Sequence, residues 1–112
     1  MVNYSVLIIK LDKKVIRSYP GITISNQLVR AGTSAALNYG EAMSASSRKD
    51  FTHKIRLVLK ELRESHIALK ILARADLCQD KAILDTTLVQ TNSLISIFVK
   101  TLNTLENNKT KA

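Results

Sequence analysis

The sequence predicts an all-α protein, folded as a single up-down-up-down four-helix bundle. The 112 residues are 46% hydrophobic but only 4% aromatic, with a single Pro and no Trp. This composition is typical of an aliphatic helical core, whereas a sandwich or barrel would need more turn residues. Apolar residues recur at alternating steps of three and four along most of the chain, which is the spacing of one helix face. The length fits one domain, since domains commonly run to roughly 100–150 residues.

The first helix is expected over residues 2–18. The apolar run at residues 6–9 would also suit a buried strand, but the spacing of the neighbouring apolar residues favours a helix. These residues are Tyr4, Ile8, Leu11, Val15 and Tyr19. The dipeptide Pro20-Gly21 predicts a turn that ends this helix.

The second helix is expected over residues 23–45, with Thr23 as its capping residue. Its small residues would allow another helix to approach closely. Gly40 costs about 1 kcal/mol of helix propensity relative to Ala, which suggests a packing contact at that position. One side of this helix carries Leu28, Ala31, Gly32, Ala35, Tyr39 and Met43.

The third and fourth helices are expected over residues 48–74 and 80–107. Ser47 and Asp50 resemble a capping box with Asp in place of Glu, and Asp80 is the candidate cap of the fourth helix. The apolar seam of the third helix consists of Phe51, Ile55, Val58, Leu62, Ser65, Leu69 and Leu72. The seam of the fourth consists of Leu84, Leu88, Thr91, Ile95, Phe98, Leu102 and Leu105. The tail at residues 108–112 lacks apolar residues and is expected to fray.

A stripe of basic residues follows the side of the third helix opposite its seam. Residues 47–74 hold eight Lys or Arg against three Asp or Glu, within a chain whose formal net charge is +8. The acids Asp50, Glu61 and Glu64 lie to the side of the stripe. We call the following residues the basic stripe, which Ile67 interrupts: Lys49, His53, Arg56, Lys60, Arg63, Lys70 and Arg74.

The basic stripe favours a polyanionic partner, because a positive field concentrates phosphates and steers their approach. Composition does not separate RNA, DNA and acidic protein, and a merely solvated face is an equally good interpretation. Residues 49–74 span about 38 Å at 1.5 Å per residue, enough to follow several phosphates. With few aromatic residues for base stacking, we expect contacts to the backbone and low sequence specificity.

No pattern indicates a catalytic or metal site. His53 and His66 are too far apart on one helix for a common metal ion, and His66 is expected to form an interhelical hydrogen bond. The lone Cys78 fits a loop position in a reducing cytoplasm. We expect no metal, no cofactor, no signal peptide and no membrane helix, which would need about 20 apolar residues. The sequence therefore predicts a non-enzyme.

Four polar residues of the second and third helices are expected to form a structural cluster. Arg30 can reach Glu64 across the helix pair, with Glu41 and Asn38 as further members. Such an ion pair fixes the register of two helices rather than creating chemistry. A catalytic role is the weaker interpretation, because no nucleophile and base accompany it.

The second and third helices carry motifs that resemble a known family. The matching stretches are residues 26–34, 38–42, 49–51 and 59–66. They resemble the bacterial four-helix bundle family known from intervening sequences in large-subunit ribosomal RNA genes, which includes the accessory protein of diversity-generating retroelements. Two departures are Val29, where a second Arg is usual, and the family's Asn-Ile-Ala-Glu-Gly, which reads Asn38-Tyr39-Gly40-Glu41-Ala42.

The resemblance implies a ring-shaped homo-oligomer, typically a pentamer, with a basic surface. For the retroelement branch it also implies binding of nucleic acid and of a reverse transcriptase. The leading hypothesis is a non-catalytic, homo-oligomeric bundle that binds RNA or DNA through the basic stripe, as an accessory to a reverse transcriptase or another enzyme. The alternative is an oligomeric scaffold that docks an acidic protein partner.

Overall fold

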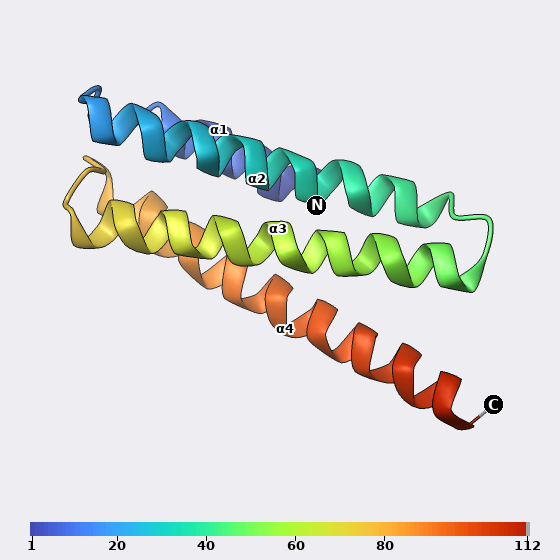
Figure 1. Ribbon diagram of the computed structural model, residues 1–112. Coiled ribbons are helices and arrows are strands. Elements are labelled where there is room, and N and C mark those ends of the chain that lie inside the picture. Colours follow the sequence, from blue (N-terminus) through green and yellow to red (C-terminus); the bar gives the residue numbers. More distant parts are fainter. Residues whose placement is uncertain (112) are drawn as a thin grey trace.

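The computed structural model describes residues 1–111, with side chains for residues 1–108, and contains four α-helices. They are α1 (Val2–Asp12), α2 (Tyr19–Met43), α3 (Arg48–Arg74) and α4 (Lys81–Lys111). Successive helices run in opposite directions (Figure 1), and α3 packs between α2 and α4 while α1 contacts α2 and α4. The all-α class and the four helices expected from the sequence are confirmed.

The core consists of the apolar faces that the helical spacing predicts. On α3, the seam residues Ile55, Val58, Leu62, Ser65, Leu69 and Leu72 are buried, and Phe51 is half-buried. On α4, Leu84, Thr91, Phe98 and Leu102 are buried, and Leu88, Ile95 and Leu105 are half-buried. These seams place the opposite side of α3 toward solvent, because residues two positions apart on a helix point in nearly opposite directions.

The first helix is shorter than predicted. It ends at Asp12, and Lys13 and Lys14 form a turn before Val15, which pairs with Cys78 as an isolated β-bridge. Ile16 N donates to Leu77 O at 2.8 Å, and Gln79 N donates to Lys14 O at 2.8 Å. Val15 is therefore buried by contact with the α3–α4 loop rather than by a continuing helix.

The second helix begins earlier than predicted, and Pro20-Gly21 forms its first turn instead of ending α1. Ser18 is the N-cap, and its Oγ accepts from Gly21 N at 3.2 Å. Proline suits the first turn because its missing N–H has no partner there in any case. The prediction of Thr23 as the cap was therefore wrong. Tyr19, expected on the buried face of the first helix, is 85% exposed.

Two glycines of α2 have opposite surroundings. A Cβ on Gly32 would lie 3.0 Å from Cγ1 of Ile8, so α1 and α2 approach closely at this point. A Cβ on Gly40 would meet no atom within 4 Å, and the packing contact predicted for Gly40 was wrong. Met43, assigned to the buried side, is 56% exposed, because α1 does not extend to that end of α2.

The starts of α3 and α4 agree with the predicted caps. Ser47 Oγ accepts from Asp50 N at 3.0 Å, and Asp80 Oδ1 accepts from Ile83 N at 3.1 Å. The bounds of α3 match the expected 48–74, whereas α2 ends at Met43 rather than at residue 45. The tail expected to fray continues α4 to Lys111, and Ala112 lies outside the described residues.

The bundle is uneven along its length, because α1 has 11 residues and α2 has 25. Tyr4 joins α1 to α4 through a 2.7 Å hydrogen bond between its hydroxyl and Thr91 Oγ1. Beyond that end of α1, the C-terminal half of α4 diverges from α2 (Figure 1). The outer face of α1 carries Val2, Val6 and Ile9, which are exposed by 72%, 43% and 43%.

One helix, α4, has the length and composition of a membrane span. Residues 81–108 of α4 include an 18-residue window of mean hydropathy 1.3. The value arises because the polar residues of α4 are mostly Thr, Ser and Asn rather than charged residues. Only 22% of that window is buried within the bundle. A single such helix is weak evidence for a membrane span, because the criterion uses length and composition alone.

Candidate nucleic-acid interface

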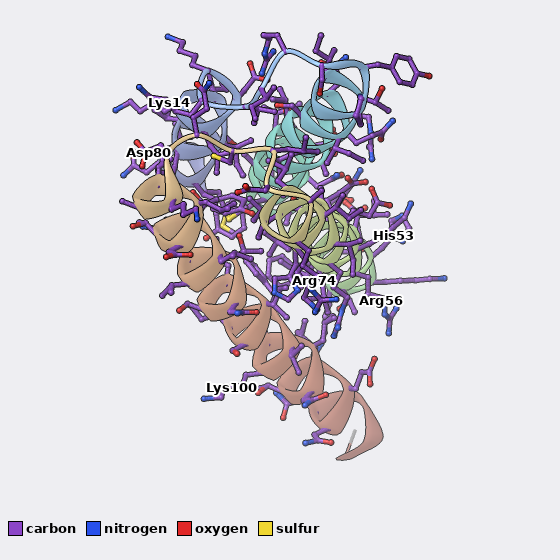
Figure 2. The ribbon with its side chains drawn as sticks, turned by 90° about the vertical axis from the view of Figure 1, so that its left-hand side faces the viewer. Lys14, His53, Arg56, Arg74, Asp80 and Lys100 are labelled. Atoms are coloured by element: carbon purple, nitrogen blue, oxygen red, sulfur yellow. The ribbon has the colours of Figure 1, made fainter. Side chains whose placement is uncertain are left out.

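The basic stripe lies on the outer side of α3. Six of its members are exposed and Lys70 is half-buried. In Figure 2, His53, Arg56 and Arg74 lie on the side of α3 that faces away from α1. Ile67, which interrupts the stripe, is 55% exposed. The structure thus presents the stripe to solvent along the length of α3.

Only Arg56 of the stripe is paired with a carboxylate among the described side chains. Its Nη2 lies 2.9 Å from Glu106 Oε1 on α4, and both side chains are more than half exposed. Such an exposed pair contributes little, typically about 0.2–1 kcal/mol. The remaining charges of the stripe are unpaired within the described part of the chain and are available to an external anion: Lys49, Lys60, Arg63, Lys70 and Arg74.

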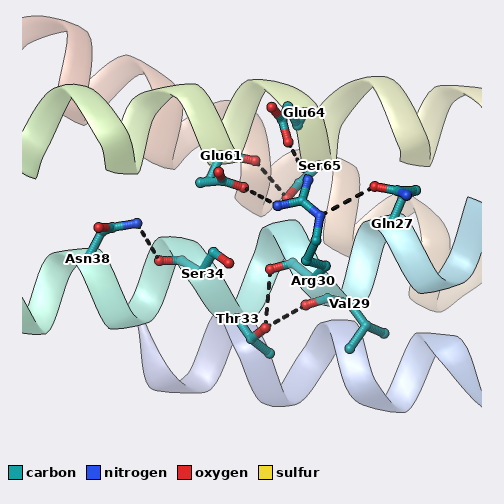
Figure 3. Close-up of polar contacts among 9 residues, drawn as sticks. All are labelled: Gln27, Val29, Arg30, Thr33, Ser34, Asn38, Glu61, Glu64 and Ser65. Carbon is teal, nitrogen blue, oxygen red and sulfur yellow. Dashed lines mark hydrogen bonds and ion pairs between the residues drawn. The ribbon is translucent and has the colours of Figure 1, made fainter.

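Arg30 connects α2 to α3 through two carboxylates (Figure 3). Its Nη2 donates to Glu64 Oε2 at 2.6 Å, and its Nη1 donates to Glu61 Oε2 at 3.3 Å. Gln27 Oε1 accepts from Nε at 3.3 Å, so each of the three guanidinium nitrogens donates a hydrogen bond. The hydrogen bond to Glu64, with the field of Glu61, raises the pKa of Arg30 above its usual value. The cluster therefore holds a permanently charged cross-link between the two helices.

The sequence analysis missed Glu61 as a partner of Arg30. Its side chain is only 11% exposed, compared with 40% for Glu64. The sequence contained the information needed, because Glu61 and Glu64 are three positions apart and lie on one face of α3. Arg30 can therefore contact both carboxylates at once.

Asn38 and Glu41 do not join the Arg30 cluster. Asn38 Nδ2 donates to Ser34 O at 3.0 Å, within α2 itself. Glu41 Oε2 accepts from Lys54 Nζ at 3.0 Å, and this ion pair lies nearer to the α2–α3 loop than Arg30 does. Both lie further along α2 than Arg30, so the four-residue cluster divides into separate local contacts. Lys54, which lies beside the stripe, is therefore already paired with a carboxylate.

An open groove of about 920 Å³ adjoins the stripe between α2, α3 and the C-terminal half of α4. Its apolar lining consists of Ile24, Leu59, Ile67, Ala68, Ile71 and Leu102. Four cations also line it: Arg30, Arg56, Lys60 and Arg63. Among the described residues, Glu64 is its one acidic lining residue, and that carboxylate is paired with Arg30. The groove was not predicted from the sequence, because it depends on how α4 diverges from the other helices.

The two remaining candidate residues have structural surroundings. His66 is half-buried, and within the described part of the chain it forms no interhelical hydrogen bond, contrary to the prediction. Burial and the nearby Lys70 lower the pKa of His66. Cys78 is buried in the α3–α4 loop, and burial raises the pKa of its thiol. Among the described residues, no group of three or more His, Cys, Asp or Glu side chains is placed to hold a metal ion.

The fold and the exposed stripe define the class of protein, an all-α four-helix bundle with a basic outer face. A model of the family described as 23S rRNA-intervening sequence protein matches residues 2–100. The chain belongs to this family, which confirms the resemblance seen in the second and third helices.

A solved structure supports the same assignment. It is the crystal structure of a protein of unknown function from the S23 ribosomal protein family of Bacteroides thetaiotaomicron. It is 26% identical to this chain and superposes with a TM-score of 0.81, covering 90% of this chain and 93% of that one. No curated protein matches the chain.

Proposed function

We propose that this protein is a non-catalytic, self-associating bundle that binds nucleic acid through the basic stripe of α3. The observation that carries the proposal is the exposure of the stripe together with the small number of its ion pairs among the described side chains. Five of its Lys and Arg residues have no carboxylate at ion-pair distance among the described side chains. Charges that neutralise phosphates release condensed counterions, and this release drives sequence-independent binding.

The proposed contacts are to phosphates rather than to bases. The stripe is built from Lys, Arg and His on one straight helix, and the chain contains only three Tyr, two Phe and no Trp. Tyr39 and Phe98 pack edge to face with ring centroids 5.8 Å apart, so they are occupied within the bundle. Sequence specificity should therefore be low, for RNA and DNA alike.

Self-association is the second part of the proposal. The exposed Val2, Val6 and Ile9 form one apolar face of α1 at steps of four and three, and a second copy would bury it. The family resemblance favours a ring, with a pentamer as the expected size. Repetition of the stripe around a ring would convert weak contacts of one subunit into useful affinity.

We propose no catalytic role. Arg30, Glu61 and Glu64 are already engaged with one another, and no activated nucleophile is paired with them. A role as an accessory of a reverse transcriptase remains a proposal that follows from the family resemblance. A buried single cysteine agrees with a cytoplasmic protein.

The test is binding of the purified protein to a structured RNA and a duplex DNA at about 0.15 M salt. The stripe variant replaces Lys60, Arg63, Lys70 and Arg74 with Gln. The control variant replaces Lys10, Lys13, Lys14 and Lys81 with Gln, which removes the same charge from exposed positions outside the stripe. The proposal expects the stripe variant to lose binding and the control variant to retain most of it. Equal losses in both variants would refute a localised site.

The alternative function is a protein-interaction scaffold whose basic face docks an acidic partner. One observation favours it specifically, because Ile67 and Ile71 leave apolar surface exposed beside the cations of α3. In this case nucleic acid would bind only at low salt, where electrostatic attraction is least screened.

A further inference from the structure

The groove between α2, α3 and α4 combines an apolar floor with a cationic rim. Ile67 and Ile71 on the floor are 55% and 40% exposed. Arg56, Lys60 and Arg63 lie along the same stretch of α3, and all three are exposed. A ligand that matches this surface must be apolar on one side and negatively charged at its edges.

The dimensions of the floor suit a short helix. Leu59 and Ile71 both line the groove and are 12 residues apart on α3, or about 18 Å at 1.5 Å per residue. A helix of about 12–15 residues covers that length and presents apolar side chains at steps of three and four.

Nucleic acid matches only half of this surface. Phosphates can contact the rim, but they gain nothing from the two isoleucines, whose burial requires apolar atoms on the ligand. An acidic amphipathic helix satisfies both parts, because its apolar face covers the floor while its carboxylates pair with the rim. The same complementarity disfavours a basic helix, since like charges placed opposite each other are repelled.

We propose that this groove is the docking site for an acidic amphipathic helix of a partner protein. The proposal rests on the scaffold role given above as the alternative function, and it names the chemistry of the partner and its site. Because Arg56, Lys60 and Arg63 belong to both the groove and the stripe, the helix and a nucleic acid compete for the same cations.

The experiment measures binding of a fluorescent synthetic peptide of about 15 residues, with Leu along one helical face and Glu on both flanks. Fluorescence anisotropy is recorded with the full chain at about 0.15 M salt. There are two control peptides. The first has the same composition in scrambled order, and the second has Lys in place of Glu. The proposal expects measurable binding of the acidic amphipathic peptide and at least about tenfold weaker binding of both controls.

Matched variants of the protein locate the site. Ile67→Ser with Ile71→Ser removes the exposed floor, and Val89→Ser with Ile97→Ser makes the same change at exposed positions of α4 outside the groove. All four side chains are exposed, so circular dichroism should show both variants folded. The floor variant should bind the peptide about tenfold or more weakly, whereas the α4 variant should bind it like the original protein.

The outcomes separate this proposal from nucleic-acid binding. The floor variant should retain affinity for duplex DNA, since its cations are unchanged. Equal binding of the peptide to the original protein and the floor variant, or no peptide binding at all, overturns the groove proposal whatever the DNA result is. A smaller oligomer in the floor variant, measured by light scattering, also overturns it, because a second copy would then cover the groove. Loss of DNA binding in the stripe variant bears on the nucleic-acid proposal alone.

Discussion

The two glycines of α2 give a paired test of how α1 packs, because alanine should have opposite effects at the two positions. At Gly40 a new Cβ meets nothing within 4 Å. Gly40→Ala should therefore gain the difference in helix propensity, about 0.5–1 kcal/mol.

At Gly32 the new Cβ would lie 3.0 Å from Cγ1, 3.3 Å from Cγ2 and 3.4 Å from Cβ of Ile8. Ile8 is fully buried, and a rotation about χ1 cannot move all three atoms away. Overpacking of a core costs about 1–3 kcal/mol, against a propensity gain of about 1 kcal/mol. We expect Gly32→Ala to lower the free energy of unfolding by about 1 kcal/mol.

Urea denaturation followed by circular dichroism measures both changes at one protein concentration. In an Ile8→Ala background, Gly32→Ala should no longer lower the free energy of unfolding, because alanine lacks Cγ1 and Cγ2, two of the three close atoms. A Gly32→Ala protein that is as stable as Gly40→Ala would refute the close approach of α1 and α2.

Three further predictions concern α1 and the α2–α3 cross-link. Burial raises the pKa of the Tyr4 hydroxyl above its usual value of 10.0. The contribution of the neutral hydroxyl to the free energy of unfolding is therefore fully present below pH 10, and it is lost as the pH rises through the folded-state pKa. Tyr4→Phe should lose about 1 kcal/mol at pH 7 and show a smaller loss of stability in alkaline urea titrations; identical alkaline profiles would count against this. Glu64→Ala should lower the melting temperature by removing one of the two carboxylates that Arg30 contacts, and unchanged melting with unchanged oligomer size would contradict it. Val6→Ser with Ile9→Ser should reduce the oligomer size in light scattering, and an unchanged mass would exclude this face of α1 from the interface.

Helical spacing correctly predicted which residues are buried where the burial depends on a single helix face. The seam of α3 from Ile55 to Leu72 and the caps at Ser47 and Asp80 are confirmed, because caps and seams are determined by residues within one or two turns. The same reasoning failed for the segment after Asp12. Val15 keeps the helical spacing, but its burial comes from Cys78, which lies 63 positions further along the chain and contacts it through the loop.

The candidate site was predictable in its charges and not in its shape. The exposed side of α3 follows directly from the position of its seam, so Lys60 and Arg63 could be assigned to solvent from the sequence. The groove next to them depends on the course of α4, because Leu102 of that helix is one of its lining residues. Arg30 was matched to Glu64 from the sequence, and Glu61 could have been matched too, because it lies three positions away on the same helix face.

The salt dependence of nucleic-acid binding tests the central proposal most directly. The affinity for a duplex DNA would be measured across a salt series for the original protein and for the variant with Lys60, Arg63, Lys70 and Arg74 replaced by Gln. Each phosphate contact contributes a slope of about −0.9 in a plot of log K against log salt. The account predicts a slope shallower by up to about 3.6 per bound subunit in the variant, with weaker binding throughout. Parallel lines for the two proteins would contradict it, because the charges of the stripe would then contact no phosphates.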